Sequence, residues 1–196
     1  MIYSIDFSDK KYLHRFQYSG RNQNLIKAAG IKNKKHMYPT IIDATAGLAK
    51  DAFQLAALGC AIFLIERNLK IFKNLKNAFN NAKKNPKISS VIDRIFLIFG
   101  DSYQIIPYLP RVDIIYLDPM FPRGKKKALS KKDSQYLHNT VNLDNDAKKL
   151  LELSILYAKK RVFLKRPKIS SWISERKPTL QIIGKRNRFD IYLITK

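Results

Sequence analysis

The sequence predicts an α/β protein built on one mostly parallel seven-stranded sheet with a C-terminal antiparallel hairpin. Short apolar runs alternate with segments of helical spacing, which is typical of strand–helix–strand units with right-handed crossovers. The last two apolar runs have no helical segment between them, so we expect them to form a hairpin. The 196 residues, 45% of them hydrophobic, provide one well-buried core and too little sequence for two full domains.

The strands can be placed in chain order from their hydrophobic pattern. Residues 40–44 (TIIDA) are apolar and β-branched and lead into a glycine-containing turn, which predicts a buried strand feeding a helix. Further strands are expected at 61–65, 94–99, 112–117, 161–165, 180–183 and 188–194.

Three helices are expected between these strands, at 52–58, at 69–84 and at about 144–158. Gly59 provides a C-terminal cap for the first helix. The second helix carries one apolar stripe, formed by Ile71, Phe72, Leu75, Ala78 and Phe79. Parallel strands of such a sheet bind ligands at their carboxyl ends, and every candidate motif described below follows a strand.

The charge balance favours a polyanionic partner. Lys and Arg number 38 against 15 Asp and Glu, a formal net charge of +23, and such a surface attracts nucleic acid through counterion release. The chain is also rich in Lys, Asn and Ile, as expected of an AT-rich genome, so part of the basic excess can reflect codon choice. An anionic membrane surface is a weaker alternative, because no basic amphipathic helix stands out.

Cellular location and metal binding are constrained by what the sequence lacks. No apolar run approaches the roughly 18 residues of a membrane span, and the N-terminus, with Asp6 and Asp9, does not resemble a signal peptide. Cys60 is the sole cysteine, which excludes an internal disulfide and a cysteine-built zinc site. We expect a reducing, cytoplasmic location. The three histidines share no metal-ligand spacing, so no metal is expected.

Three strand ends carry residues suited to a nucleoside cofactor. Gly47 follows the first strand and permits close approach of the backbone to a ligand. Glu66 lies 19 positions later, at the end of the second strand, where a carboxylate can accept hydrogen bonds from ribose hydroxyls. Asp101, with Ser102 beside it, follows the third strand and can accept a hydrogen bond from an adenine amino group.

Each of these carboxylates could instead be a helix cap or part of a solvated turn. Three at successive strand ends favour the cofactor interpretation. The dinucleotide fingerprint is absent, since residues 46–51 read AGLAKD, so an adenosine cofactor without pyrophosphate fits best, and S-adenosylmethionine is the commonest. Lys50 and Asp51 could also contact it, although Asp51 in the first turn of a helix equally favours the helix dipole.

The motif YLDPMFP at 116–122 predicts the reaction. An exocyclic amine is a poor nucleophile, and the Asp118 carboxylate together with the Pro119 carbonyl could accept its two N–H bonds and hold it toward a methyl sulfonium. Phe121 could stack on the base. No strong general base is required, because the alkylated nitrogen loses its proton easily. The alternative is an ordinary Asp-Pro turn.

Two basic segments are candidates for RNA phosphate binding. The segment 123–132 follows the motif directly and could act as a phosphate clamp, although a solvated loop explains its charge equally well. Its candidate residues are Lys125, Lys126, Lys127, Lys131 and Lys132. Lys165 and Arg166, at the end of the fifth strand, could hold phosphate from the opposite wall.

Taken together, these stretches resemble the ribosomal small-subunit methyltransferase J family. The matching segments are DATAGLAKDAF (43–53), LGCAIFLIERN (58–68), YLDPMFP (116–122), KKALSKK (126–132), KRVFLKRP (160–167) and RFDIY (188–192), with HRFQYSGRNQNLIKAAGIK (14–32) ahead of the first strand. The resemblance implies a Rossmann-like class I S-adenosylmethionine-dependent methyltransferase fold and methylation of guanine N2 in 16S-type ribosomal RNA within the small subunit. It implies cofactor contacts at Lys50, Asp51, Glu66, Arg67, Asp101, Ser102 and Asp118.

Two features depart from the family pattern. Members usually have Gly-Arg-Asp where this chain has Ala49-Lys50-Asp51, so Ala49 should be tolerated only if its φ is negative, and Lys50 lacks the bidentate fork of arginine. Fewer residues precede His14 than is typical, which suggests a trimmed N-terminal subdomain. We expect residues 1–35 to form a short extension packed on a methyltransferase domain at 36–196.

Two other functions stay open at this point. One is an amino-methyltransferase acting on adenine N6 in DNA or on transfer RNA. The other is an RNA-binding assembly factor on a catalytically degenerate methyltransferase fold. The substitution at Ala49 and the short N-terminus favour this second function.

Overall fold

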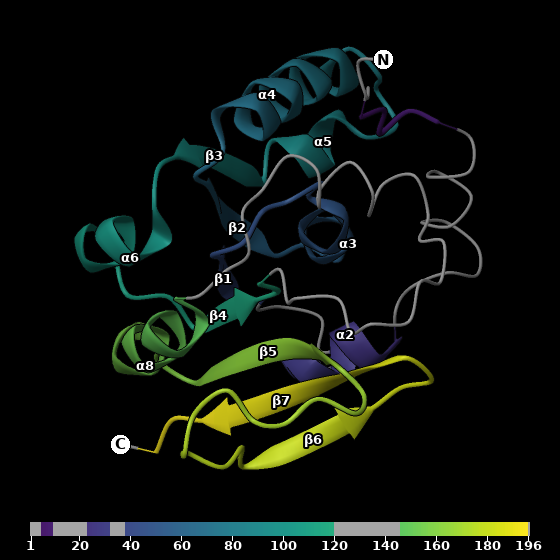
Figure 1. Ribbon diagram of the computed structural model, residues 1–196. Helices are drawn as coiled ribbons and strands as arrows, with labels where there is room; N and C mark the ends of the chain where they lie inside the picture. The colour runs from purple at the N-terminus through teal and green to yellow at the C-terminus, as the bar shows by residue number, and fades with distance from the viewer. Residues whose placement is uncertain (1–4, 10–22, 32–37, 120–145, 196) are drawn as a thin grey trace, which may run out of the picture.

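A seven-stranded mixed sheet organises the computed structural model, which describes residues 5–9, 23–31, 38–119 and 146–195 (Figure 1). The strand order is β3-β2-β1-β4-β5-β7-β6. Neighbours among β1 to β5 are parallel, whereas β7 is antiparallel to both β5 and β6. The strands are β1 (Thr40–Asp43), β2 (Ala61–Glu66), β3 (Ile95–Phe99), β4 (Ile114–Leu117), β5 (Arg161–Pro167), β6 (Leu180–Ile183) and β7 (Asn187–Leu193). The predicted mostly parallel sheet with a C-terminal hairpin is confirmed.

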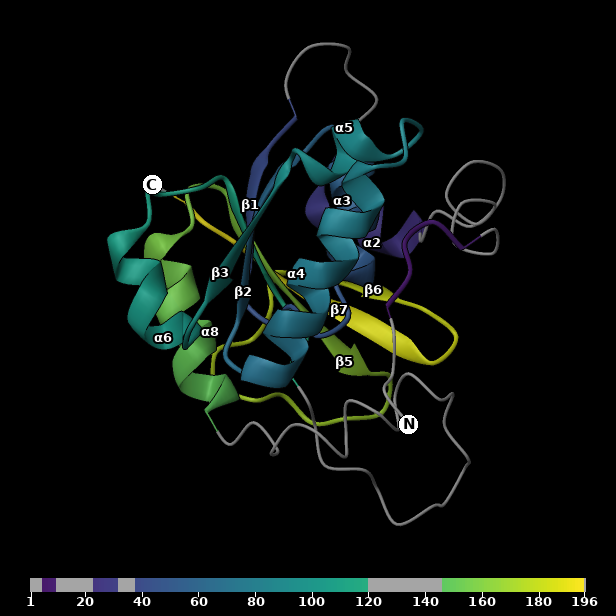
Figure 2. The ribbon, with the colours of Figure 1, turned by 90° about the horizontal axis from the view of Figure 1, so that it is seen from above.

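Helices cover both faces of the sheet, as the view along the sheet shows (Figure 2). One face carries α2 (Gln23–Ala29), α3 (Lys50–Ala57), α4 (Leu69–Lys83) and α5 (Ser89–Ile92). The other carries α6 (Ser102–Ile105), the 3-10 turn η2 (Ile106–Tyr108) and α8 (Ala147–Tyr157). Two apolar clusters fill the layers on the two faces of the sheet. Consecutive strand residues point to opposite faces, so Ile41 belongs to one cluster and Ile42 to the other. No helix in the described ranges is long and apolar enough to cross a membrane.

The helix α4 shows how local sequence sets these elements. Asn68 caps its first turn, because the side-chain oxygen accepts hydrogen bonds from the backbone N–H groups of Lys70 and Ile71 at 3.0 and 3.2 Å. The predicted apolar stripe is buried except for Phe72, which lies at the margin and contacts the ring of Phe99 at 5.1 Å. The helix therefore fixes the direction of the chain as it leaves β2.

The N-terminal residues that the structure describes belong to the core. Phe7 is fully buried and stacks on Phe53 and Phe79, with ring centroids 5.0 and 5.1 Å away. The helix α2, which the hydrophobic pattern did not predict, packs against the β5–β7–β6 side of the sheet. Arg161 on β5 donates a hydrogen bond to the carbonyl of Ala28 at the end of α2. This side of the sheet is thus covered by residues ahead of β1.

Candidate active site

The strand order brings the predicted acidic residues to one edge of the sheet. The carboxyl ends of β3, β2, β1 and β4 lie side by side in that order, and they carry Asp101, Glu66, Asp43 and Asp118. Lys165 lies close to the end of β5, the next strand along. This edge is therefore lined by charged side chains from five neighbouring strands, as expected of a ligand site in an open sheet.

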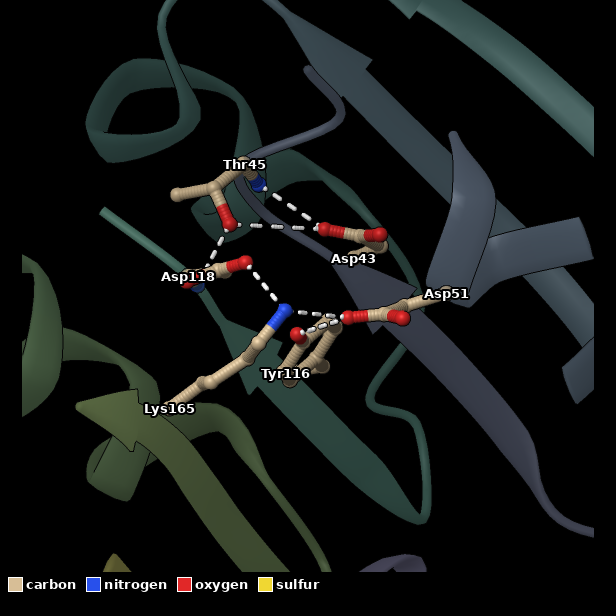
Figure 3. A network of polar contacts seen from close by, with 6 residues as sticks. All are labelled: Asp43, Thr45, Asp51, Tyr116, Asp118 and Lys165. Atoms are coloured by element: carbon tan, nitrogen blue, oxygen red, sulfur yellow. Dashed lines mark hydrogen bonds and ion pairs between the residues drawn. The ribbon is translucent and has the colours of Figure 1, made fainter. Parts of the chain in front are cut away.

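The turn after β1 is tied to the turn after β4. Asp43 accepts a hydrogen bond from the backbone N–H of Thr45 at 3.0 Å, and the Thr45 hydroxyl accepts one from the N–H of Asp118 at 2.7 Å (Figure 3). Below them, the N–H of Ala44 donates to the Tyr116 carbonyl at 3.0 Å. These contacts hold the Asp118-Pro119 turn, in which Pro119 is buried, in a fixed position against β1.

Lys165 lies at the centre of the site, between two carboxylates (Figure 3). Its Nζ is 2.8 Å from Oδ2 of Asp51 and 2.8 Å from Oδ2 of Asp118. The Tyr116 hydroxyl also donates to Oδ2 of Asp51, at 2.6 Å, and its ring stacks on Phe163. Asp51 therefore does more than favour the dipole of α3, because it shares an ammonium ion with the predicted reaction turn.

Burial and mutual repulsion shift the ionisation of this cluster. Burial raises the pKa of Asp43 to about 8, and the nearby charges of Asp51 and Asp118 add to the rise. Burial disfavours the charged form of Asp51 as well, but Lys165 outweighs it and holds the pKa of Asp51 below its usual value. Burial raises the pKa of Asp118, with Lys165 opposing the rise. Burial alone would lower the pKa of Lys165, and the two carboxylates raise it well above its ordinary value.

Glu66 organises the turn in which Gly47 lies. Its Oε2 accepts a hydrogen bond from the N–H of Gly47 at 3.0 Å, and its Oε1 accepts one from the N–H of Asn68 at 2.7 Å. The same turn corrects one prediction, because Ala49 has a φ of +54° and a ψ of +23°, in the left-handed region, instead of a negative φ. A hydrogen bond from the N–H of Ala49 to the Ala46 carbonyl, at 2.8 Å, closes the turn directly ahead of α3.

Asp101 and Ser102 have structural partners of their own. Asp101 caps α6 by accepting a hydrogen bond from the N–H of Tyr103 at 2.8 Å, and its second oxygen lies 3.6 Å from Arg67. The buried Ser102 hydroxyl donates to the Ala44 carbonyl at 2.6 Å and thus ties the start of α6 to the turn after β1. The cap that the sequence left open as an alternative is present at Asp101, and the cofactor contacts of both residues stay predictions.

The predicted phosphate-binding wall at the end of β5 is not supported. Lys165 is paired with two carboxylates and only 20% exposed, so a phosphate would have to displace them. Arg166 is 5% exposed and lies on the opposite face of the sheet, where burial lowers its pKa. The other proposed RNA contacts, Lys125, Lys126, Lys127, Lys131 and Lys132, lie outside the described residues, as does Phe121.

Sequence reasoning did not assign a role to Asp43, Thr45 or Tyr116. Asp43 ends β1 directly before the turn, which is the same signal that selected Glu66 and Asp118. The hydroxyl contacts of Thr45 and Tyr116 depend on the register between β1 and β4, which the sequence does not give. In the described part of the chain, no group of three or more His, Cys, Asp or Glu side chains is arranged to hold a metal ion.

The donor and acceptor set of this edge fits a cationic nucleoside. Carboxylates at the ends of β2 and β3 can accept hydrogen bonds from ribose hydroxyls and an amino group. Gly47 has no side chain, so a bound nucleoside can come close to the backbone there. Asp51 and Asp118 share one ammonium ion, that of Lys165, so the carboxylates at this point outnumber the cation between them. Such an environment attracts a positively charged group to the space beside the Asp118-Pro119 turn.

Comparison with known proteins identifies the class. The family model described as "Putative SAM-dependent methyltransferase" matches residues 1–194. The crystal structure of a SAM-dependent methyltransferase from Neisseria gonorrhoeae superposes with a TM-score of 0.76 at 30% identity, covering 98% of this chain and 74% of that one. An RNA methyltransferase from Salinibacter ruber in complex with S-adenosyl-L-homocysteine has a TM-score of 0.55 at 14% identity and shares the fold alone. The protein is an S-adenosylmethionine-dependent methyltransferase.

Relatives of higher identity define the family within this class. Ribosomal RNA small subunit methyltransferase J of Aeromonas salmonicida is 42% identical over 193 residues, which cover 97% of this chain and 77% of that protein. The protein of the same name from Buchnera aphidicola is 40% identical over 192 residues, 96% of this chain and 76% of that protein. The chain belongs to the ribosomal RNA small subunit methyltransferase J family, which confirms the resemblance seen in its motifs.

Proposed function

We propose that this protein transfers the methyl group of S-adenosylmethionine to the exocyclic N2 of a guanine in small-subunit ribosomal RNA. Family membership supports the substrate, since relatives at 37 to 42% identity carry that name. The observation that carries the chemistry is the Asp118 carboxylate, fixed at the end of β4 by Thr45 and placed 2.8 Å from Lys165. We infer a class I methyltransferase fold, a cytoplasmic location and a domain at 36–196 preceded by an extension at 1–35, which the buried Phe7 supports.

The chain's own residues would hold the reactants as follows. Glu66 and Asp101 would bind the nucleoside part of S-adenosylmethionine, which supplies an activated methyl group on a sulfonium. Asp118 and the Pro119 carbonyl would accept the two N–H bonds of the guanine amine and orient the nitrogen lone pair. Because the nitrogen becomes positive as the new bond forms, a carboxylate at this position stabilises the transition state more than the ground state.

The test is methyl transfer by the purified protein from labelled S-adenosylmethionine to small ribosomal subunits that lack the modification. Transfer RNA and DNA serve as the competing substrates, and mass spectrometry locates the methyl group. We expect Asp118→Ala to lower the rate by about 100-fold or more while the protein stays folded. The matched control is Asp93→Ala, since Asp93 is 61% exposed and lies ahead of β3, at the opposite edge of the sheet.

Three results would contradict the proposal. Methylation of adenine in DNA or of transfer RNA, with none of the ribosomal RNA, would refute the substrate. An Asp118→Ala protein that methylates at the wild-type rate would refute the role of Asp118. Failure of the folded wild-type protein to bind S-adenosylmethionine by titration calorimetry would favour the degenerate RNA-binding factor.

A further inference from the structure

A cluster of exposed basic side chains lies beside the active site, on two turns at the end of β5 and between β6 and β7. We call it the basic rim and define it by Lys168, Lys185 and Arg186, with Ile169 among them. All three cationic residues are exposed, and Ile169 is 96% exposed. None of these three cations forms an ion pair with another residue that the structure describes.

The basic rim lies at the same edge of the sheet as the reaction turn. β5 ends at Pro167, two residues and about 7 Å along the strand from Lys165. The first rim turn follows directly, and the second is the hairpin turn between β6 and β7 (Figure 1). The two turns are neighbours because Asn187, the first residue of β7, pairs with Pro167. A hydrogen bond from the N–H of Lys168 to the Arg186 carbonyl, at 3.0 Å, joins the two turns. The rim and the carboxylate cluster therefore face the same side of the molecule.

A buried arginine holds the rim in place. Arg188, which is 6% exposed, donates from Nη1 to the carbonyls of Lys168 and Ser170 at 2.9 and 2.7 Å. Asp190, also buried, accepts from the same guanidinium at 2.8 and 3.2 Å. This buried ion pair fixes the backbone of the first turn, so the backbone that carries Lys168 is already ordered before a ligand binds.

We propose that the basic rim binds the phosphate backbone of the RNA strand next to the target nucleotide. This proposal rests on the proposed function, because it assumes that the substrate is RNA. Unpaired lysine and arginine side chains on fixed turns are suited to phosphate oxygens, and the exposed Ile169 offers an apolar contact to a ribose or base. The rim offers cations for phosphate at the end of β5 without requiring Lys165 to leave Asp51 and Asp118.

The test combines binding and activity in the triple variant Lys168→Ala, Lys185→Ala, Arg186→Ala. Binding to a fluorescent single-stranded fragment of small-subunit ribosomal RNA is measured by anisotropy at several salt concentrations. We expect the dissociation constant to rise roughly tenfold, and the slope of its logarithm against log salt to fall by about 2, or about 0.7 per lost phosphate contact. In the transfer assay the KM for RNA should rise, whereas the KM for S-adenosylmethionine should stay unchanged.

Two controls separate this site from the general charge of the protein. The variant Lys76→Ala, Lys84→Ala, Lys87→Ala removes three exposed cations near α4 and α5, at the opposite end of the molecule from β6 (Figure 1). It should change RNA affinity less than twofold, because charges far beyond a Debye length are screened. Lys168→Arg with Lys185→Arg keeps the charge and should bind like wild type.

The outcomes distinguish the two proposals. If the rim variant and the remote variant bind RNA equally well, the basic rim is not a phosphate site, whatever the enzyme modifies. If the rim variant loses affinity only for assembled subunits and not for the RNA fragment, the rim contacts ribosomal protein and the proposal is wrong. If the rim variant binds RNA weakly but the wild type methylates no ribosomal RNA, the rim stands and the proposed function fails.

Discussion

Replacement of Asp43 by asparagine should stabilise the protein at neutral and alkaline pH. Asp43 is 2% exposed, and its pKa is raised by burial from 3.8 to about 8. At neutral pH the native protein therefore keeps a proton on Asp43 that the unfolded chain has lost. Asparagine is neutral at every pH, has nearly the same shape, and can still accept the hydrogen bond from the N–H of Thr45.

The sign and size of the effect follow from this difference in bound protons. Between pH 3.8 and about 8 the native state binds one proton more than the unfolded state at Asp43, so the free energy of unfolding falls as pH rises. The loss is about 1.4 kcal/mol per pH unit and reaches about 4 kcal/mol by pH 7. The Asp43→Asn variant should lack this contribution.

Urea unfolding followed by circular dichroism at pH 5, 6, 7 and 8 tests the prediction. The stability of Asp43→Asn relative to wild type should grow with each pH step. Asp93→Asn provides the control, because Asp93 is 61% exposed and its replacement removes a carboxylate outside the buried cluster. If the difference between Asp43→Asn and wild type is the same at all four pH values, Asp43 is not protonated in the native state and the reasoning fails.

Two further substitutions test the turn after β1 and the ion pairs of Lys165. Ala49→Gly should raise the free energy of unfolding by about 1 kcal/mol, because Ala49 has a φ of +54° that glycine adopts without strain. Ala52→Gly, inside α3, should lower it, and stabilisation by both would contradict the argument. Lys165→Met should lower the free energy of unfolding by about 3 kcal/mol at pH 7, because Asp51 and Asp118 lose the ammonium that they share. Urea titration measures the free energy of unfolding of each variant. If Lys165→Met is as stable as wild type, the ion pairs of Lys165 contribute nothing to stability.

Much of the fold and part of the site could be predicted because both depend on local pattern. Buried parallel strands are short apolar runs, and their ends are marked by the first polar residue after each run, here Glu66 and Asp118. Once five such strands are parallel, their ends must share one edge. The convergence of the acidic residues on that edge therefore required no knowledge of side-chain positions.

The remaining features depend on details of the structure that a hydrophobic pattern does not reveal. Both faces of β5 are covered by helices, so hydrophobic periodicity does not show that Lys165 points to the α3 side and Arg166 to the opposite one. Ala49 has a left-handed conformation at the junction between the turn after β1 and α3, and its residue type argued against that conformation. The helices α5 and α6 have four residues each, too few for a helical period to be visible.

The distribution of charge explains how one protein can handle a cationic cofactor and a polyanionic substrate at the same edge. The chain carries a formal charge of +23, yet at the reaction turn the carboxylates of Asp51 and Asp118 share a single ammonium, that of Lys165. Carboxylates there attract a sulfonium and repel phosphate, whereas cations on the basic rim attract phosphate and repel the sulfonium. Under the two proposals, an RNA strand that approaches this edge would place its backbone over β5 and β7. The uncharged base would then be the part of the nucleotide that approaches Asp118, and its amine the group that the carboxylate accepts hydrogen bonds from.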